Sequence, residues 1–388
     1  MNPQHRPLTI MQVASSFTSW GGMEIHLLNL AQQLQRRGHR AIIAAQPGKW
    51  VHQQAAAKGL ETFDATVLRQ QDWTDFKRYR EFLRREKVDV LHTHTNWDAV
   101  VPAAAARVAG VPVAVMTWHL PFPFKDRRGG DLILSLLYKR MIAVSGSVRD
   151  RHIAHGVDAR KVQVIHHGTD TEAFRAVTLP RDAVREALGL PPDALAVGVL
   201  GRVSPEKGHF DLLEALRRLS NTHPHLRVVI VGDGPDVPAL HEASAALGLA
   251  DKVIFTGFRD DVNNVINALD IVAVPSNWHE PCSAVVQQGM ALAKPVVGSR
   301  IGGTPEMIAE NETGLLVPAS DPTALADAIA SFAADPALRS RMGDAGAARA
   351  EEFFTLALMT DKVEALYYQE LTQAASWPSP NLRRRAVS

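Results

Sequence analysis

Two permanent cations stand five residues apart in the stretch Gly201-Arg202-Val203-Ser204-Pro205-Glu206-Lys207-Gly208. The apolar run Ala194 to Leu200 before it is typical of a buried strand, so the stretch begins at a strand's carboxyl end. Open parallel sheets bind ligands at that end. Because a guanidinium is a planar fork and an ammonium a point charge, Arg202 and Lys207 together suit a diphosphate. Taken alone, the stretch also fits a solvated loop with ordinary surface cations.

A second stretch with chemical side chains follows the apolar run Ile271 to Val274 and extends from Pro275 to Ala291. Glu280 and Gln288 stand eight residues apart within it. That spacing is just over two helical turns if one helix spans both residues, so they could reach different parts of one elongated ligand.

The start of the helix expected at Ala284 to Leu292 offers backbone donors. The amides of Ser283 and Ala284 would face outward there, a place that suits phosphate oxygens. Cys282, the only cysteine, stands just before them. It excludes an internal disulfide and fits a reducing compartment, and with no base partner evident we interpret it as a packing residue rather than a nucleophile.

Together these stretches resemble the retaining GT-B glycosyltransferases of glycosyltransferase family 4, whose members carry a G-x-x-x-P-E-K-G loop and a Glu-x7-Glu motif. Further short motifs extend the likeness over nearly the whole chain, in the family's order: Gly21-Gly22-Met23-Glu24, Thr117-Trp118-His119, His167-Gly168-Thr169-Asp170 and Gly232-Asp233-Gly234-Pro235. The sequence departs from the family at Gln288, where a second Glu is usual, and at His167, where Asn is usual. That Glu generally binds the nucleotide ribose, and Gln keeps an acceptor oxygen without the charge. The exchange therefore bears on donor affinity or nucleotide preference, or has little consequence.

The resemblance implies an α/β fold of the GT-B class, with two doubly wound Rossmann-like domains whose parallel sheets face a central cleft. It implies transfer, with retention, of a hexosyl-type group from a nucleotide-diphosphate sugar to a hydroxyl of a sugar, lipid-linked glycan or small molecule. The expected setting is cell-envelope glycan synthesis, such as lipopolysaccharide or exopolysaccharide. A UDP-sugar is favoured over a GDP-sugar as donor because UDP is the commonest donor nucleotide across the family.

The resemblance also assigns catalytic roles. Arg202 and Lys207 would stabilise the charge that develops on the leaving diphosphate. Glu280 would bind hydroxyls of the donor sugar, and His119 would lie near those hydroxyls. Glu280 could instead act as the nucleophile of a double displacement, although family members are generally argued to react on one face.

Further donor-binding residues are carried over from the family: Gly22, Gly201, Gly232, Gly234, Phe258, Arg259, Cys282, Ser283, Ala284 and Gln288. Gly22 has no Cβ, which lets the backbone approach the diphosphate or sugar closely. The turn at Gly232 resembles the family's nucleotide-facing turn and is not a G-x-G-x-x-G sequence, which argues against an oxidoreductase. Phe258 and Arg259 match the position whose backbone usually meets the base.

Phe122, Phe124 and Lys125 belong to a proline-aromatic-basic loop that leads into an apolar helical pattern at 132–138. The resemblance places acceptor binding in the first domain, so these residues are acceptor-site candidates, with a packed connecting loop as the alternative. His92 and His94 stand two apart without a convincing third ligand, so we expect no metal and no cofactor beyond the donor.

The composition, with 46% hydrophobic and 21% charged residues, is that of an ordinary globular protein. Residues 1–173 hold 23 Lys and Arg against 15 Asp and Glu, whereas residues 174–388 hold 19 against 26. The basic first half favours an anionic acceptor or peripheral contact with the cytoplasmic face of the inner membrane, and no nucleic-acid partner is expected. No apolar run has the length of a spanning helix and no secretory leader is evident, so we expect a cytoplasmic protein.

Apolar runs alternate with helical patterns in both halves, which predicts parallel sheets with right-handed crossovers. Strands are expected at 8–14, 40–45, 88–92, 111–116, 141–144, 162–166, 196–200, 227–231, 253–256, 271–274, 295–298 and 314–317. Helices are expected at 24–37, 75–86, 98–108, 209–219, 237–247, 262–269, 284–292, 322–334, 336–352 and 356–375. A polar joint at 170–192 predicts an acceptor-binding domain at 1–173, with helix 356–375 packing back on it, a nucleotide-sugar domain at 174–355 and a tail at 376–388.

Two other functions fit parts of the sequence. A nucleotide-sugar 2-epimerase of the same fold is not expected to carry the Glu280 loop. A degenerate, non-catalytic glycan-binding subunit would explain Gln288 and His167, but the presence of Arg202, Lys207 and Glu280 argues against it.

Overall fold

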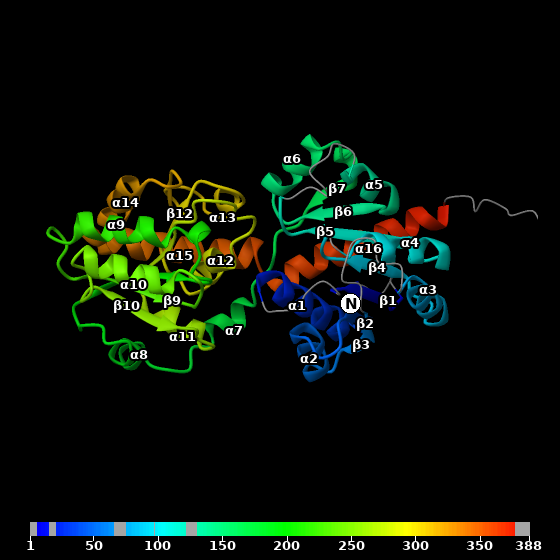
Figure 1. Ribbon diagram of the computed structural model, residues 1–388, viewed down its shortest axis with the longest axis horizontal. Helices are drawn as coiled ribbons and strands as arrows, with labels where there is room; N and C mark the ends of the chain where they lie inside the picture. Colours follow the sequence, from blue (N-terminus) through cyan, green and yellow to red (C-terminus); the bar gives the residue numbers. More distant parts are fainter. Residues whose placement is uncertain (1–5, 15–20, 66–74, 97, 122–129, 377–388) are drawn as a thin grey trace, which may run out of the picture. The chain divides into compact units, whose positions relative to one another are not determined.

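The computed structural model describes residues 6–14, 21–65, 75–96, 98–121 and 130–376. Contacts divide the chain into two compact units. The first unit comprises Met1–Ala143, Arg151–Ile165 and Thr360–Ser388, and the second comprises Val144–Asp150 and His166–Met359. Each unit contains one parallel sheet flanked by helices (Figure 1).

The first unit has a seven-stranded sheet with the order β3-β2-β1-β4-β5-β6-β7. Its strands are β1 (Thr9–Val13), β2 (Arg40–Ala45), β3 (Glu61–Asp64), β4 (Val90–Thr93), β5 (Val113–Trp118), β6 (Arg140–Ala143) and β7 (Val162–Val164). Its helices are α1 (Gly22–Arg36), α2 (Trp50–Ala57), α3 (Phe76–Arg85), α4 (Val100–Ala109), α5 (Gly130–Leu137) and most of α16 (Leu356–Ser376). Helix α6 (Gly146–Ala154) begins in the second unit and ends in the first.

The second unit has a six-stranded sheet with the order β10-β9-β8-β11-β12-β13. Its strands are β8 (Leu195–Leu200), β9 (Leu226–Val231), β10 (Val253–Gly257), β11 (Ile271–Val274), β12 (Val296–Ser299) and β13 (Gly314–Val317). Its helices are α7 (Thr171–Arg175), α8 (Arg181–Ala187), α9 (His209–Leu219), α10 (Val237–Ala246), α11 (Val262–Ala268), α12 (Ala284–Ala291), α13 (Thr304–Met307), α14 (Pro322–Ala334) and α15 (Pro336–Phe353). Among the residues described here, no helix combines the length and the apolar character needed to cross a bilayer.

Both faces of the second sheet are covered, which explains why its strands read as continuous apolar runs. Val197 and Val199 of β8 pack with residues of α9, α10 and α14. Ala196 and Leu200, on the other face of the same strand, pack with residues of α8, α11 and α12. The alternation follows from the period of two in a strand and produces a three-layer unit (Figure 1).

The expected fold class, two Rossmann-like domains with parallel sheets, is confirmed. The strands and helices predicted from the sequence are present, with ends displaced by at most two residues. Six elements were not predicted from the sequence: β3, α2, α6, α7, α8 and α13. Strand β3 buries only Phe63, and α7 and α8 lie in the polar segment interpreted as a joint, so their short apolar patterns gave little signal.

Each sheet has one switch point, where the chain stops adding strands on one side of its first strand and begins to add them on the other side. In the first sheet β1 pairs with both β2 and β4, and in the second β8 pairs with both β9 and β11. The helices that follow the two central strands therefore leave toward opposite sides, which defines the switch point of a doubly wound sheet. Residues that follow β1 and β4, or β8 and β11, are thus at the places where doubly wound sheets bind ligands.

Gly208 and Gly248 share a left-handed backbone conformation but differ in the space around them. Substitutions at the two positions therefore distinguish backbone strain from steric overlap with a neighbouring loop. Gly208 has a φ of 70° and a Cβ there would lie 1.9 Å from the Pro275 carbonyl oxygen, whereas Gly248 has a φ of 69° and open space around it. Gly248→Ala should cost about 1–2 kcal/mol from the left-handed conformation alone. Gly208→Ala should cost more than about 4 kcal/mol or prevent folding, because backbone cannot yield as a side chain can. Urea unfolding of both variants tests this, and equal losses would contradict the close approach of the two loops.

Candidate functional site

The loops at the carboxyl edge of the second sheet contact one another through their backbones. Gly232, after β9, has a φ of 138° and no room for a Cβ, which would lie 1.9 Å from the Gly201 carbonyl oxygen. In the same way, a Cβ at Gly234 would lie 2.1 Å from the Val203 carbonyl oxygen. On the other side, the Asn277 amide donates to the Glu206 carbonyl oxygen at 3.0 Å. The loops after β9, β8 and β11 therefore form one continuous surface.

An ion pair joins the loops that flank the switch point. Lys207 Nζ donates to Glu280 Oε2 at 2.8 Å, and the Ser276 hydroxyl donates to the same oxygen at 2.7 Å. The Glu280 side chain is 7% exposed, so its charge needs these partners, while the Lys207 side chain is 31% exposed. Among the described residues, both hydrogen bonds to this carboxylate end on Oε2, which leaves Oε1 as an acceptor for another donor.

The loop after β12 supports Glu280 from the other side. The Gly303 amide donates to the Glu280 carbonyl oxygen at 2.8 Å, and Gly302, at a φ of 55°, has no room for a Cβ beside that carbonyl. His279, the residue before Glu280, has a φ of 39°, an uncommon conformation for a residue with a side chain. The backbone at Glu280 is thus held in place by its neighbours on both sides.

Arg202 lies in the same loop as Lys207 but is exposed and makes no hydrogen bond or ion pair with any described residue. The structure therefore brings Lys207 and Glu280 together and leaves the Arg202 guanidinium in solvent. Helix α12 begins at Ala284, so Glu280 lies in a loop and Gln288 on a helix, and one helix does not span the two. Ser283 is the buried N-cap of α12.

The remaining donor-binding candidates have varied surroundings. Phe258, just after β10, is 59% exposed, whereas Arg259 is engaged in a two-bond ion pair with Asp261 at 2.7 Å. Cys282 packs beside the apolar cluster of α8, α11 and α12, and burial raises the pKa of its thiol to about 12. A thiol with that pKa stays protonated at neutral pH, which agrees with a packing role.

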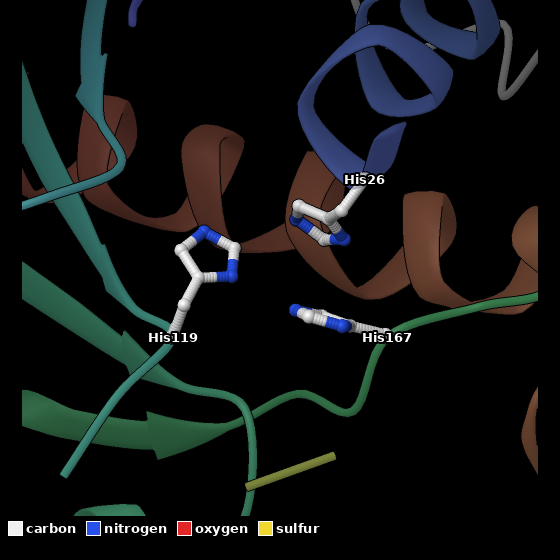
Figure 2. A group of neighbouring side chains, drawn as sticks. All are labelled: His26, His119 and His167. Carbon is white, nitrogen blue, oxygen red and sulfur yellow. The ribbon is translucent and has the colours of Figure 1, made fainter. Parts of the chain in front are cut away.

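At the carboxyl edge of the first sheet, buried polar residues gather after β1, β4 and β5. His119, which follows β5, is 4% exposed, and Figure 2 shows His26 of α1 reaching toward it. The two rings are 5.0 Å apart in an edge-to-face arrangement. His94, after β4, places its Nδ1 3.2 Å from His119 Nε2, and Gln12 of β1 contacts His94 Nε2 through Oε1 at 2.9 Å.

Burial favours the neutral form of His26 and His92. Desolvation lowers the pKa of His26 well below its ordinary value, helped by His119 and His92, and lowers the pKa of His92 to about 3. His92 is bonded to the hydroxyls of Tyr367 and Thr117 at 2.6 and 2.7 Å. His26 and His119 place ring nitrogens within 4.8 Å of each other, and imidazole nitrogens are common metal ligands. Independence from metal stays a prediction.

Gly22 is the exposed first residue of α1, and a Cβ there would meet nothing within 4 Å. The acceptor-site candidates Phe122, Phe124 and Lys125 lie outside the described residues.

Several residues that shape these sites were not predicted from the sequence: Gln12, His26, Ser276, Gln287, Gly302 and Glu306. Gln287 is fully buried, accepts from the Thr169 hydroxyl at 2.8 Å and donates to the His167 carbonyl oxygen at 2.9 Å. Most of these residues stand inside patterns that read as ordinary strand or helix. The Gly302-Gly303 pair was the one visible signal, because adjacent glycines after a strand indicate close backbone approach.

Glu306 of α13 stabilises the start of α6. Its carboxylate accepts from the amides of Gly146 and Ser147 at 2.9 and 3.1 Å and from His166 Nε2 at 2.8 Å. Burial opposes ionisation of Glu306, but the hydrogen bonds from His166 and the two amides outweigh it, and its pKa lies below the ordinary value. An anion at a helix start is favoured by the free amides and the helix dipole.

Known proteins share both units of this chain. Residues 20–173 match the family described as Glycosyltransferase Family 4, and residues 180–349 match the family described as Glycosyl transferases group 1. A D-inositol 3-phosphate glycosyltransferase of Stackebrandtia nassauensis is 30% identical over 407 residues, which cover 94% of this chain and 90% of that protein. The lipopolysaccharide core biosynthesis glycosyltransferase LpsE of Rhizobium meliloti is 30% identical over 84% of this chain and 89% of its own. The crystal structure of Anabaena HepE in complex with UDP matches with a TM-score of 0.84 at 23% identity, over 93% of this chain and 100% of that one.

Two Rossmann-like domains, each built on one parallel sheet whose strand order has a switch point, define the GT-B class of α/β proteins. Within that class, the chain belongs to the group 1 glycosyltransferases, whose first domain is of the Glycosyltransferase Family 4 type. The expected enzyme class, a glycosyltransferase, is thereby confirmed.

The lowered pKa of Glu306 predicts an acid-sensitive part of the stability. Because the folded-state pKa is depressed, the carboxylate stabilises the fold above the unfolded-state pKa of about 4.3, and this contribution is lost as pH falls through the folded-state value. Glu306→Gln should reduce the free energy of unfolding by about 1–3 kcal/mol at pH 7. The difference from the wild type should shrink as pH falls from 6 toward 3 in urea titrations. Glu312→Gln, at an exposed carboxyl, is the control, and a Glu306→Gln difference that stays constant or grows on acidification would contradict the assignment.

Proposed function

We propose that this glycosyltransferase moves a hexosyl-type group, with retention of anomeric configuration, from a nucleotide-diphosphate sugar to the hydroxyl of a sugar, lipid-linked glycan or small molecule. The observation that carries the proposal is the Lys207–Glu280 pair at the switch point of the second sheet. It places a cation suited to a diphosphate beside a carboxylate with one oxygen open to a sugar hydroxyl. UDP is the favoured nucleotide, since HepE, which shares the fold, was crystallised with UDP.

The leaving diphosphate sets the demand on the protein. As the anomeric bond breaks, negative charge develops on the bridging oxygen and must be stabilised by groups already in place. Lys207 is held in place by Glu280, and the exposed Arg202 guanidinium is not committed to any described residue. The amides at the start of α12 add partial positive charge. Residues 201, 232 and 234 are glycines, so no side chain at these positions would prevent a diphosphate from approaching the backbone.

We assign Glu280 to hydroxyls of the donor sugar and His119 to a sugar hydroxyl, as the family resemblance implies. The proposed reaction occurs on one face of the sugar, with the leaving oxygen helping to take the proton of the acceptor. Relatives act in lipopolysaccharide core synthesis and on inositol 3-phosphate, which supports an acceptor in cell-envelope glycan or a related small molecule. The reaction is proposed to need no metal, and the protein to work in the cytoplasm or at the inner membrane's cytoplasmic face.

Incubation with a panel of nucleotide sugars tests the function directly. Many transferases slowly hydrolyse their own donor, so release of UDP from one UDP-sugar, with the α-anomer of the sugar as first product, is expected. The release should persist in EDTA. Release from no donor would contradict transferase chemistry, and loss in EDTA restored by Mg²⁺ or Mn²⁺ would contradict metal independence. A covalent adduct trapped on Glu280 would replace the one-face reaction by double displacement.

Removal of either cation should slow the chemical step. Arg202→Ala and Lys207→Ala should each lower kcat by about 10²–10³-fold, equivalent to about 2.7–4 kcal/mol of transition-state stabilisation. Arg202→Ala is the cleaner variant because that side chain is exposed and supports no described residue. Lys252→Ala, at the amino end of β10, is the matched control and should retain wild-type turnover. Near-normal kcat in Arg202→Ala and Lys207→Ala, with folding verified by circular dichroism, would refute the assigned roles.

A further inference from the structure

A continuous hydrogen-bonded chain leads from β1 to His119 in the first unit. Gln12 Oε1 lies 2.9 Å from His94 Nε2, and His94 Nδ1 lies 3.2 Å from His119 Nε2. All three side chains are buried, at 0%, 1% and 4% exposure. They occupy the carboxyl edge at β1, β4 and β5, neighbouring strands of the first sheet.

The donors and acceptors along this hydrogen-bonded chain require one particular tautomer of the His94 ring and one of the His119 ring. An amide oxygen only accepts hydrogen bonds, so His94 Nε2 carries a proton and donates to Gln12. A neutral His94 then has a lone pair on Nδ1, which accepts from His119 Nε2–H. A neutral His119 protonated at Nε2 keeps its lone pair on Nδ1. In these two hydrogen bonds, the direction of donation follows from the orientation of the Gln12 amide.

Burying the polar side chain of Gln12 at this position is energetically unfavourable. Central strands of parallel sheets are built from apolar residues, and the neighbours Ile10, Met11 and Val13 of β1 follow that rule. The Gln12 Nε2 group is buried without a hydrogen-bond partner among the described residues. Such an orphaned donor is unfavourable, because folding removes its hydrogen bonds to water and supplies none in return. The one hydrogen bond that offsets this cost is the bond from His94 to Oε1, which indicates that the contact with His94 is what the amide supplies.

We propose that Gln12 and His94 are positioning residues that hold His119 in the tautomer protonated at Nε2, so that its Nδ1 accepts a hydrogen bond from a hydroxyl of the bound sugar. The inference rests on the proposed function, which assigns His119 to the sugar. It adds the two buried residues that decide which ring nitrogen of His119 accepts. The stacked rings of His94 and His119, at 5.5 Å and 26°, hold the orientation in addition to the hydrogen bond.

Nitrogen NMR of the ligand-free protein tests the tautomer without any assay of activity. Long-range ¹H–¹⁵N spectra of histidine-labelled protein distinguish protonated from unprotonated ring nitrogens, and His119→Phe identifies the His119 signals. The wild type should show a neutral His119 with the proton on Nε2. In Gln12→Leu and His94→Leu the His119 signals should shift toward a mixture of tautomers.

His39→Leu is the matched control. His39 is a buried histidine that accepts from the Leu8 amide at 3.0 Å, before β2 and so at the opposite edge of the same sheet. Its loss should lower stability without moving the His119 signals. A wild-type His119 protonated at Nδ1, or an unchanged tautomer in Gln12→Leu and His94→Leu, would overturn the proposal.

A double-mutant cycle supplies the kinetic test. His94→Leu should lower kcat/KM for the donor by about 10- to 100-fold, as loss of an orienting partner commonly does. In the His119→Ala background the same change should have almost no further effect, because His94 acts only through His119. If the losses of the His94→Leu and His119→Ala variants instead multiply in the double variant, His94 has a structural role separate from His119 and the proposal is overturned. If no nucleotide sugar is turned over, the proposed function fails while the NMR result still decides the tautomer.

Discussion

The ion pair between Lys207 and Glu280 is the interaction on which the second domain's site depends. It bridges the loops that follow β8 and β11, the two strands on either side of the switch point. A buried carboxylate without its cation would be costly, so the pair fixes the position of both side chains before any ligand arrives. In the proposed reaction, the diphosphate takes the ammonium as a partner, while the carboxylate keeps the Ser276 hydroxyl and an open oxygen.

Small residues make this pair possible. A Cβ at Gly208, Gly232 or Gly302 would overlap the backbone of a neighbouring loop, so glycine at these positions lets the loops after β9, β8, β11 and β12 lie in direct contact. The first domain uses a different device at the equivalent edge. There, histidines and a glutamine replace the apolar residues expected in buried strands, and hydrogen bonds between them offset the cost of burial. Both edges are therefore polar and are supported by parallel sheets.

Much of this architecture could be predicted from the sequence because it depends on short-range pattern. Continuous apolar runs such as 271–274 and amphipathic runs such as 209–219 located strands and helices with nearly the right ends. The pairing of Lys207 with Glu280 was within reach of the same reasoning, since both follow strands of one parallel sheet. The roles of Arg202, Glu280 and His119 came from family resemblance, and these roles remain proposals.

Other features depend on contacts that local pattern does not reveal. Gln12 stands inside an apolar strand and His26 inside a helix, so neither indicated that it would lie beside His94 or His119. Glu306 reads as an ordinary acid at a helix start, yet its partners Gly146 and Ser147 are about 160 residues away in the sequence. The short elements α7 and α8 were hidden by the polarity of their segment.

The central claim is that the carboxyl edge of the second sheet binds a nucleoside diphosphate through Lys207. Calorimetric titration of the full chain with UDP, GDP and ADP tests it most directly. The account predicts micromolar binding of at least one of them, UDP before the others, with the affinity reduced at least about tenfold in a folded Lys207→Ala variant. Binding of none at micromolar concentration, or equal affinity with and without the ammonium, would contradict it.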